Sequence, residues 1–180
     1  MRFSLLPFPA QDIPDIKISG RVNRQKNILS VHYSVTGKIG QIFFPSPIAH
    51  PARKNDLWRT TCFEFFLAVK DSSQYWEFNL SPSGDWNVYV MDGYRQVNMR
   101  EETRTQRLQF KVQKDVDCFL LEADIDLNPI FPKDISIEAG IASVIQADHG
   151  RESYWALIHP HPIADFHLRH SFILEFPSST

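Results

Sequence analysis

Apolar and polar side chains alternate along most of this chain, and this period of two limits its possible folds more than any other feature. The alternation is plainest in residues 61–69 and 75–81, where a large apolar side chain stands at every second position. Apolar spacings of three and four residues, which indicate helices, are almost absent. Because successive side chains of a strand point to opposite faces, the pattern predicts an all-β protein. We expect one domain over residues 1–180, an antiparallel two-sheet β-sandwich.

The strands are expected where the alternation is strongest, and Gly, Pro, Asn or Asp marks most of the gaps between them. Their predicted ranges are 2–6, 15–20, 28–36, 59–69, 74–81, 85–91, 106–114, 117–126, 134–146, 152–159 and 171–176. The long proline-containing stretch 37–58 is expected to hold no element of its own, and 93–105 is where a short helix could form. Long loops on sheets often carry binding residues.

Composition excludes several classes of protein. Hydrophobic residues make up 43% of the chain and charged residues 22%, which is typical of a soluble globular domain. The net charge is −2 and the charges are mixed, so no nucleic acid is expected as a partner. No run is long enough for a membrane span, so no membrane partner is expected either. Cys62 and Cys118 lie in strand-like runs and are expected to be reduced packing thiols.

The N-terminal residues lack the apolar stretch of a secretory signal peptide, because prolines interrupt them. A cytoplasmic location is therefore expected, although removal of an export signal would leave the same sequence.

The alternation assigns one face of each strand to the core. The side chains expected inside are Phe63, Phe65, Leu67, Trp76, Phe78, Leu80, Ile137, Ile141 and Trp155. The opposite face of two neighbouring strands carries Glu64, Glu77 and Asn79, mixed with aromatic rings. It is either a solvated outer surface, which antiparallel sandwiches commonly have, or a ligand-binding face. Acids, an amide and rings together suit sugars, which need acceptors for hydroxyls and a flat surface for C–H groups.

Four further residues complete the candidate ligand site. Trp58 ends the long loop and is a candidate for an exposed ring, with Arg59 beside it as a hydrogen-bonding fork. Tyr89 is expected to supply a second stacking ring, and Arg95 a second bidentate donor. Trp86, by contrast, comes directly after a tight turn and is expected to cover the end of the core.

No complete catalytic motif or phosphate-binding loop is present, so no catalytic residue is expected. Four of the seven histidines lie in residues 159–170, but the prolines among them and the lack of a locally spaced acid argue against a metal site. We expect no metal and no cofactor.

Four segments, 56–66, 75–87, 93–95 and 165–167, together resemble the bacterial DOMON-like proteins, which are relatives of the type 9 carbohydrate-binding modules. The Trp-x-x-Thr-Cys-Phe-Glu and Glu-Phe-Asn-x-Ser-Pro-Ser-Gly-x-Trp runs carry the resemblance. It implies an antiparallel β-sandwich whose concave sheet binds a ligand, which is sugar in one branch of the superfamily and haem in another.

The leading hypothesis is a non-catalytic module that binds a carbohydrate or a glycan-like metabolite. The candidate ligand-binding residues are Trp58, Arg59, Glu64, Glu77, Asn79, Tyr89 and Arg95. A glycosidase using Glu64 and Glu77 as acid and base is one alternative. A haem-binding redox module is the other; it would need Met91 or Met99 to face His159, His161 or His167. Carboxylates beside the macrocycle would be costly to bury, so we expect the protein to bind no haem.

Overall fold

The computed structural model describes residues 1–9, 13–95 and 98–178, and nearly all of its regular structure is β-strand. The strands are β1 (Arg2–Pro7), β2 (Ile16–Gln25), β3 (Ile28–Gly37), β4 (Cys62–Val69), β5 (Tyr75–Leu80), β6 (Trp86–Met91), β7 (Arg100–Glu101), β8 (Phe110–Lys114), β9 (Cys118–Asp126), β10 (Ile137–Gln146), β11 (Glu152–Ala156) and β12 (Leu174–Phe176). Three one-turn 3₁₀ helices accompany them: η1 (Ile39–Gln41), η2 (Leu57–Arg59) and η3 (Arg169–Ser171).

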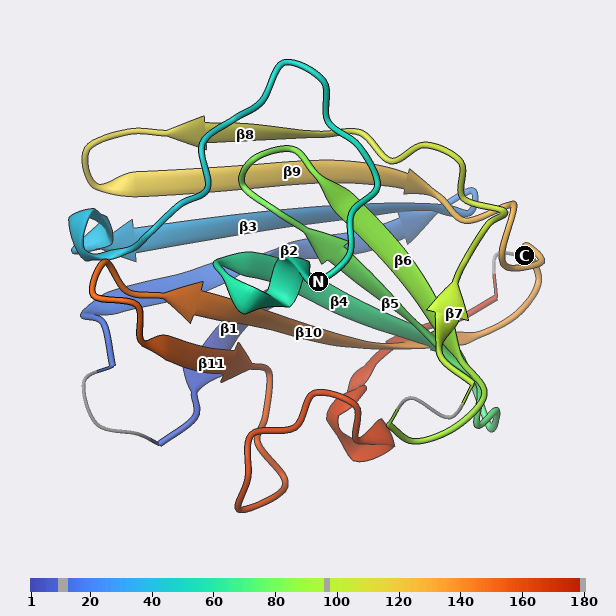
Figure 1. Cartoon of the computed structure of the whole chain (residues 1–180). Coiled ribbons are helices and arrows are strands. Elements are labelled where there is room, and N and C mark those ends of the chain that lie inside the picture. The colour runs from blue at the N-terminus through green and yellow to red at the C-terminus, as the bar shows by residue number, and fades with distance from the viewer. Residues whose placement is uncertain (10–12, 96–97, 179–180) are drawn as a thin grey trace.

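All the strand pairs are antiparallel, and the sheet curls over on itself to make two layers (Figure 1). The strand order is β7-β6-β5-β4-β10-β11-β1-β2-β3-β9-β8, and β12 pairs with β10. β1 joins the layers because its first part pairs with β2 and its last two residues pair with β11. The predicted antiparallel β-sandwich is therefore confirmed.

The main core lies between the two layers, where the apolar faces of the strands meet. All nine side chains that the alternation assigned to the interior are at most 4% exposed. Phe63 of β4 stacks on Phe119 of β9 with ring centroids 5.2 Å apart, which packs one layer against the other. The Tyr33 hydroxyl also crosses between the layers and donates to the main-chain oxygen of Glu64 at 2.7 Å.

The local turns are explained by the residues placed in them. Lys26 and Asn27 connect β2 to β3 and both have positive φ, 48° and 62°, as a two-residue type I′ hairpin requires. Gly84, in the turn before β6, has a φ of 96°, and a Cβ there would lie 2.8 Å from the Pro51 ring. Trp86 comes after that turn and is buried in the core, as predicted.

Strand ends and short turns differ from the sequence-based expectation. Five strands are shorter than predicted by three residues or more: those expected at 59–69, 106–114, 134–146 and 171–176 begin at Cys62, Phe110, Ile137 and Leu174, and that at 152–159 ends at Ala156. The strand expected at 15–20 is longer and ends at Gln25. The stretch 37–58 contains η1 and enters η2, although no element was expected there. A single 3₁₀ turn is too short to produce a visible period.

The region 93–105, where a short helix was considered, contains β7 and no helix among its described residues; 96 and 97 lie outside them. No helix in the described part of the chain is long and apolar enough to cross a bilayer. Cys62 and Cys118 are free thiols, the first buried and the second half-buried.

Candidate functional site

The strand register brings the two acids of the second face together. Glu64 of β4 lies opposite Asn79 of β5, and Glu77 of β5 lies opposite Phe66 of β4 and Tyr89 of β6. Side chains on one face of neighbouring strands interact when they are opposite or diagonal. Glu64 and Glu77 are therefore diagonal neighbours.

This face is covered rather than solvated. Glu64 is 2% exposed and Glu77 is 5% exposed, while Asn79 and Tyr89 are also buried. The interpretation of a solvated outer surface is therefore wrong for this part of the sheet. The reason is that the chain returns over the face after β11, which periodicity within the strands does not reveal.

The segment 157–173 makes the cover, and aromatic rings hold it in place (Figure 1, where it comes after β11 in orange and red). Phe66 of β4 is in contact with the rings of His167 and Phe172, at centroid distances of 5.5 and 5.7 Å. Gly140 of β10 lies beneath Phe172, and a Cβ there would come within 3.0 Å of that ring. The Tyr75 hydroxyl forms a 3.0 Å hydrogen bond with His167 Nδ1. The cover is thus packed against the sheet at several points.

An open cavity of about 230 Å³ remains between this cover and the sheet. Its lining comes from four strands and three connecting segments: Trp58, Glu64, Glu77, Arg95, Met99, Val144, Glu152, Tyr154, Ala164, Asp165, Phe166 and His167. Acids thus lie at the sheet, and aromatic rings and a histidine lie around them.

The two acids of the sheet are poorly compensated. Burial raises the pKa of Glu64 well above its ordinary value, and the neighbouring Glu77 raises it further. Burial also raises the pKa of Glu77, while His167 and a 2.7 Å hydrogen bond from Asn79 Nδ2 lower it. Glu64 Oε1 is buried and has no hydrogen-bond partner in the described structure. In the folded protein both carboxyls therefore hold their protons to higher pH than a solvated glutamate does.

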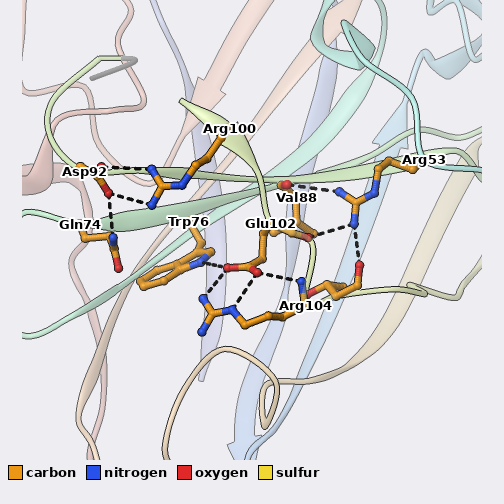
Figure 2. Close-up of polar contacts among 9 residues, drawn as sticks. Arg53, Gln74, Trp76, Val88, Asp92, Arg100, Glu102 and Arg104 are labelled. Carbon is orange, nitrogen blue, oxygen red and sulfur yellow. Dashed lines mark hydrogen bonds and ion pairs between the residues drawn. The ribbon is translucent and has the colours of Figure 1, made fainter. Parts of the chain in front are cut away.

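Arginines near this region are engaged elsewhere. Figure 2 shows Arg100 bonded to Asp92 and Arg104 bonded to Glu102. It also shows Arg53 directed at main-chain oxygens, including that of Glu102 at 3.1 Å. None of these arginines forms an ion pair with the two glutamates of the cavity.

Arg95 lines the cavity but is paired with an acid of the cover. Its Nε donates to Asp165 Oδ2 at 3.0 Å, and the Tyr94 hydroxyl donates to the same oxygen. Asp165 Oδ1 accepts the main-chain N–H of His167 at 3.0 Å. Burial raises the pKa of Asp165. These hydrogen bonds lower it by more, so the net shift of the pKa is downward. Asp165 thus positions both Arg95 and His167 at the cavity.

The seven residues predicted for the ligand site are distributed unequally. Glu64, Glu77, Trp58 and Arg95 line the cavity. Asn79 and Tyr89 do not appear in the lining; Asn79 supports Glu77, and Tyr89 meets Trp58 edge-on at 5.7 Å. The last, Arg59, is exposed, pairs with Asp56 at 3.5 Å and is also outside the lining.

Sequence reasoning did not place the side chains of the β11 and cover segments in the site. Glu152 and Tyr154 alternate on β11 and lie opposite Gln146 and Val144 of β10, so their period of two was the available signal. In the sequence, the only signal at Asp165, Phe166 and His167 was that they form one of the four segments of the family resemblance. Their place over the sheet depends on an irregular loop, for which the sequence holds no periodic signal.

Two acids on other strands with the same alternation do not reach the cavity. Glu122 of β9 lies on the other layer and hydrogen-bonds His32 at 3.2 Å. Glu138 of β10 pairs with Arg169. Glu122 is outside the cavity because β9 belongs to the opposite layer, and Glu138 is outside the lining because Arg169 of the cover holds it.

The described residues do not suit a haem or a metal. His167 Nδ1 is engaged by Tyr75, and the His159 ring bonds to the main-chain oxygen of Leu6 at 2.8 Å. Met91 is fully buried in the cluster beneath the cover. Two buried carboxyls would have to face the macrocycle, which is costly. Among the described residues, no group of three or more His, Cys, Asp or Glu is arranged to hold a metal ion.

No protein-family model and no curated protein sequence matches this chain. Solved structures do. A proposed carbohydrate-binding protein from Bacteroides uniformis superposes with a TM-score of 0.64 at 14% identity, over 95% of this chain and 83% of that one. A family 9 carbohydrate-binding module from Caldicellulosiruptor kristjanssonii in complex with cellotriose gives 0.52 at 13% identity, over 82% and 68% of the two chains. Its complex with glucose gives 0.53 at 13%, over 92% and 78%. The chain therefore has the β-sandwich fold of family 9 carbohydrate-binding modules.

Proposed function

We propose that this protein is a non-catalytic carbohydrate-binding module that holds one sugar unit in the cavity between β4, β5 and the cover. The observation that carries the proposal is the composition of the cavity wall. Hydrogen-bonding acids lie at the sheet and aromatic rings lie around them, within one open cavity. The set matches the two needs of a pyranose, directed partners for hydroxyls and a flat apolar surface for C–H groups.

The size of the cavity supports a single sugar unit. Sites for drug-sized ligands have volumes of roughly 300–1,000 Å³. The cavity here, at about 230 Å³, is somewhat smaller and is open on one side. One ring would sit inside, and the rest of a longer glycan would extend past Met99, which is partly exposed at the cavity.

Each lining side chain has a role in this proposal. Glu64 and Glu77 contact hydroxyls at the sheet, and Trp58 stacks on the sugar face. Arg95 donates from the cover while it remains paired with Asp165. Asn79 and Tyr89 act indirectly, by positioning Glu77 and Trp58.

The fold likeness supports the same function. The family 9 module with this sandwich was solved with cellotriose and with glucose. On the four segments of sequence that carry the resemblance, we further propose that the chain belongs with the DOMON-like relatives of these modules.

Binding is favoured over hydrolysis by the arrangement of the acids. A glycosidase needs one ionised and one protonated carboxyl on either side of the scissile bond. Glu64 and Glu77 are side by side on one sheet face, and burial raises the pKa of both. Two acids that both reach the sugar from the same side do not flank its scissile bond.

The test is calorimetric titration of the purified protein with hits from a glycan array. Trp58→Ala and Glu77→Gln should each weaken binding by about tenfold or more, because the first removes the stacking ring and the second removes a buried carboxyl that contacts hydroxyls. Glu122→Gln, on the other layer, is the matched control and should bind like the parent. If no glycan binds, or if both cavity variants bind like the parent, the proposal is wrong. Release of sugar from chromogenic glycosides would favour the glycosidase instead.

A further inference from the structure

The charges around the cavity are unbalanced. Its acidic and basic lining residues, within the described part of the chain, are Glu64, Glu77, Glu152, Asp165, Arg95 and His167. Arg95 is committed to Asp165, whose side chain is 3% exposed. Three carboxyls then remain, with one imidazole as the possible counter-charge. No lysine or arginine of the described residues forms an ion pair with Glu64 or Glu77.

One of these acids also has a carboxyl oxygen without a hydrogen-bond partner. Glu64 is 2% exposed, lines the cavity, and its Oε1 is buried without a partner in the described structure. Leaving a buried polar atom unpaired costs about 1–3 kcal/mol, and more for a charged group. A ligand that donates to this oxygen, and supplies positive charge, would remove that cost.

We propose that the sugar unit held in this cavity carries a protonated primary amine, whose ammonium group donates to Glu64 and Glu77. The inference rests on the proposed carbohydrate binding and narrows its ligand to amino sugars. An ammonium has three donors and no acceptor. It therefore suits two carboxyls whose other partners are the Cys62 thiol at Glu64, and the Asn79 amide and His167 at Glu77.

The aromatic part of the wall suits the same ligand. Trp58, Tyr154 and Phe166 line the cavity together with the acids. Ring faces attract cations, and the attraction is stronger where water is excluded. The same rings can pack on the C–H face of the sugar, so one wall serves both the cation and the pyranose.

Binding has a proton balance that can be measured. The amine stays protonated, and each carboxyl that ionises to meet it releases its proton to solvent. Glu64 faces Cys62 on its own strand, Glu77 on β5 and Tyr154 on β11. Glu77 faces His167 from the cover and the hydroxyls of Tyr75 and Tyr89. Of these groups, the two glutamates are the ones that the ammonium would ionise directly.

The experiment compares D-glucosamine, N-acetyl-D-glucosamine and D-glucose by calorimetric titration at slightly acidic pH, in two buffers with different enthalpies of protonation. We expect D-glucosamine to bind about tenfold to a hundredfold more tightly than the two neutral sugars, since hydrogen bonds to charged groups contribute about 1.5–3 kcal/mol. The buffer difference should report proton release with D-glucosamine and none with D-glucose.

Variants assign the effect to the two acids. Glu64→Gln and Glu77→Gln keep the side-chain size and should each abolish the preference for D-glucosamine and reduce proton release. Glu122→Gln is the matched control on the other layer and should preserve both. Circular dichroism of each variant checks that it is folded, and if one single variant is unfolded the other, with the two-buffer titration of the parent, still tests the site.

The outcomes separate the two proposals. Equal affinity for D-glucose and D-glucosamine, or a preference unchanged in both glutamine variants, would overturn the ammonium site and leave carbohydrate binding intact. Absence of binding by all three sugars and by a glycan array would overturn the proposed function itself. Cyclohexylamine binding as tightly as D-glucosamine would support the ammonium contact and overturn the restriction to sugars.

Discussion

The outward faces of the two layers begin from the same pattern of alternating residues and reach opposite environments. On β3 and β9, the polar residues are solvated and meet partners across the strands: Ser30 donates to Asp124, and His32 bonds Glu122. On β4 and β5, Glu64 and Glu77 are almost completely buried. We call the first surface the open face and the second the covered face.

The difference comes from segments outside the strands themselves. The covered face receives the segment 157–173, whose Phe172 packs on Phe66 and Tyr75, and the loop that carries Trp58. The open face keeps its polar side chains in water, where an ion pair contributes little. A carboxyl under the cover loses its hydrating water, so burying its charge is costly unless another group pairs with it. The same type of residue is therefore solvated on one face and buried with few partners on the other.

The largest expected effect comes from removing the main ring of the cover. Phe172→Ala should lower the free energy of unfolding by about 3–5 kcal/mol, because it deletes a buried aromatic side chain that packs on two others. Leu120→Ala, a half-buried side chain of β9, should cost clearly less. Denaturant unfolding measures both. Equal losses would mean that the covered face is no better packed than the open one.

A smaller loss of stability is expected from replacing Asp165, the acid that hydrogen-bonds Arg95, Tyr94 and His167. Asp165→Asn should lower the free energy of unfolding by about 1–3 kcal/mol, because Tyr94, Arg95 and the His167 N–H lose a charged acceptor. The pKa of Asp165 is lowered in the folded protein, so this stabilisation is present at neutral pH and is lost as pH falls through that pKa. The variant should therefore approach the parent in acid. Asp124→Asn is the matched change on the open face and should stay within about 0.5 kcal/mol.

The ring at the cavity mouth should affect stability still less. Trp58 is half-buried and meets Tyr89 edge-on, so Trp58→Ala should cost about 0.5–1.5 kcal/mol by thermal unfolding. Its effect on sugar affinity should exceed its effect on stability. A loss of several kcal/mol would instead identify Trp58 as a core residue rather than a binding one.

Glu64→Gln is expected to change the free energy of unfolding least in acid. The change should grow as pH rises. The pKa of Glu64 in the folded protein lies well above the ordinary 4.5, because of burial and Glu77. Above pH 4.5 the folded protein then holds more protons than the unfolded chain, so its free energy of unfolding falls as pH rises. Glu64→Gln removes this loss, so the stability of the variant relative to the parent should increase as pH rises above 4.5.

Denaturation curves at several pH values provide the measurement. Glu122→Gln, whose side chain is exposed on β9, is the control and should change stability by no more than about 0.5 kcal/mol at any of them. A Glu64→Gln curve parallel to that of the parent would contradict the burial of an uncompensated carboxyl.

Period-two alternation alone determined the strands, the side chains of the core and the pairing of Glu64 with Glu77 on one face. These are local properties, because a strand side chain points up or down according to its parity. Neighbouring strands joined by a short turn, as β4, β5 and β6 are, then bring their shared faces together.

The tertiary structure decided which polar face would be covered and by what. Glu122 and Glu64 have the same parity signal, and the segments that return over β4 and β5, chiefly the chain after Ala156, separate the solvated acid from the buried one. That path is irregular, so no periodic pattern predicts that His167 returns to β5 or that Arg95 is paired with Asp165. Burial, charge balance and the cavity arise from contacts between residues distant in sequence, and the residue types of one strand do not contain them.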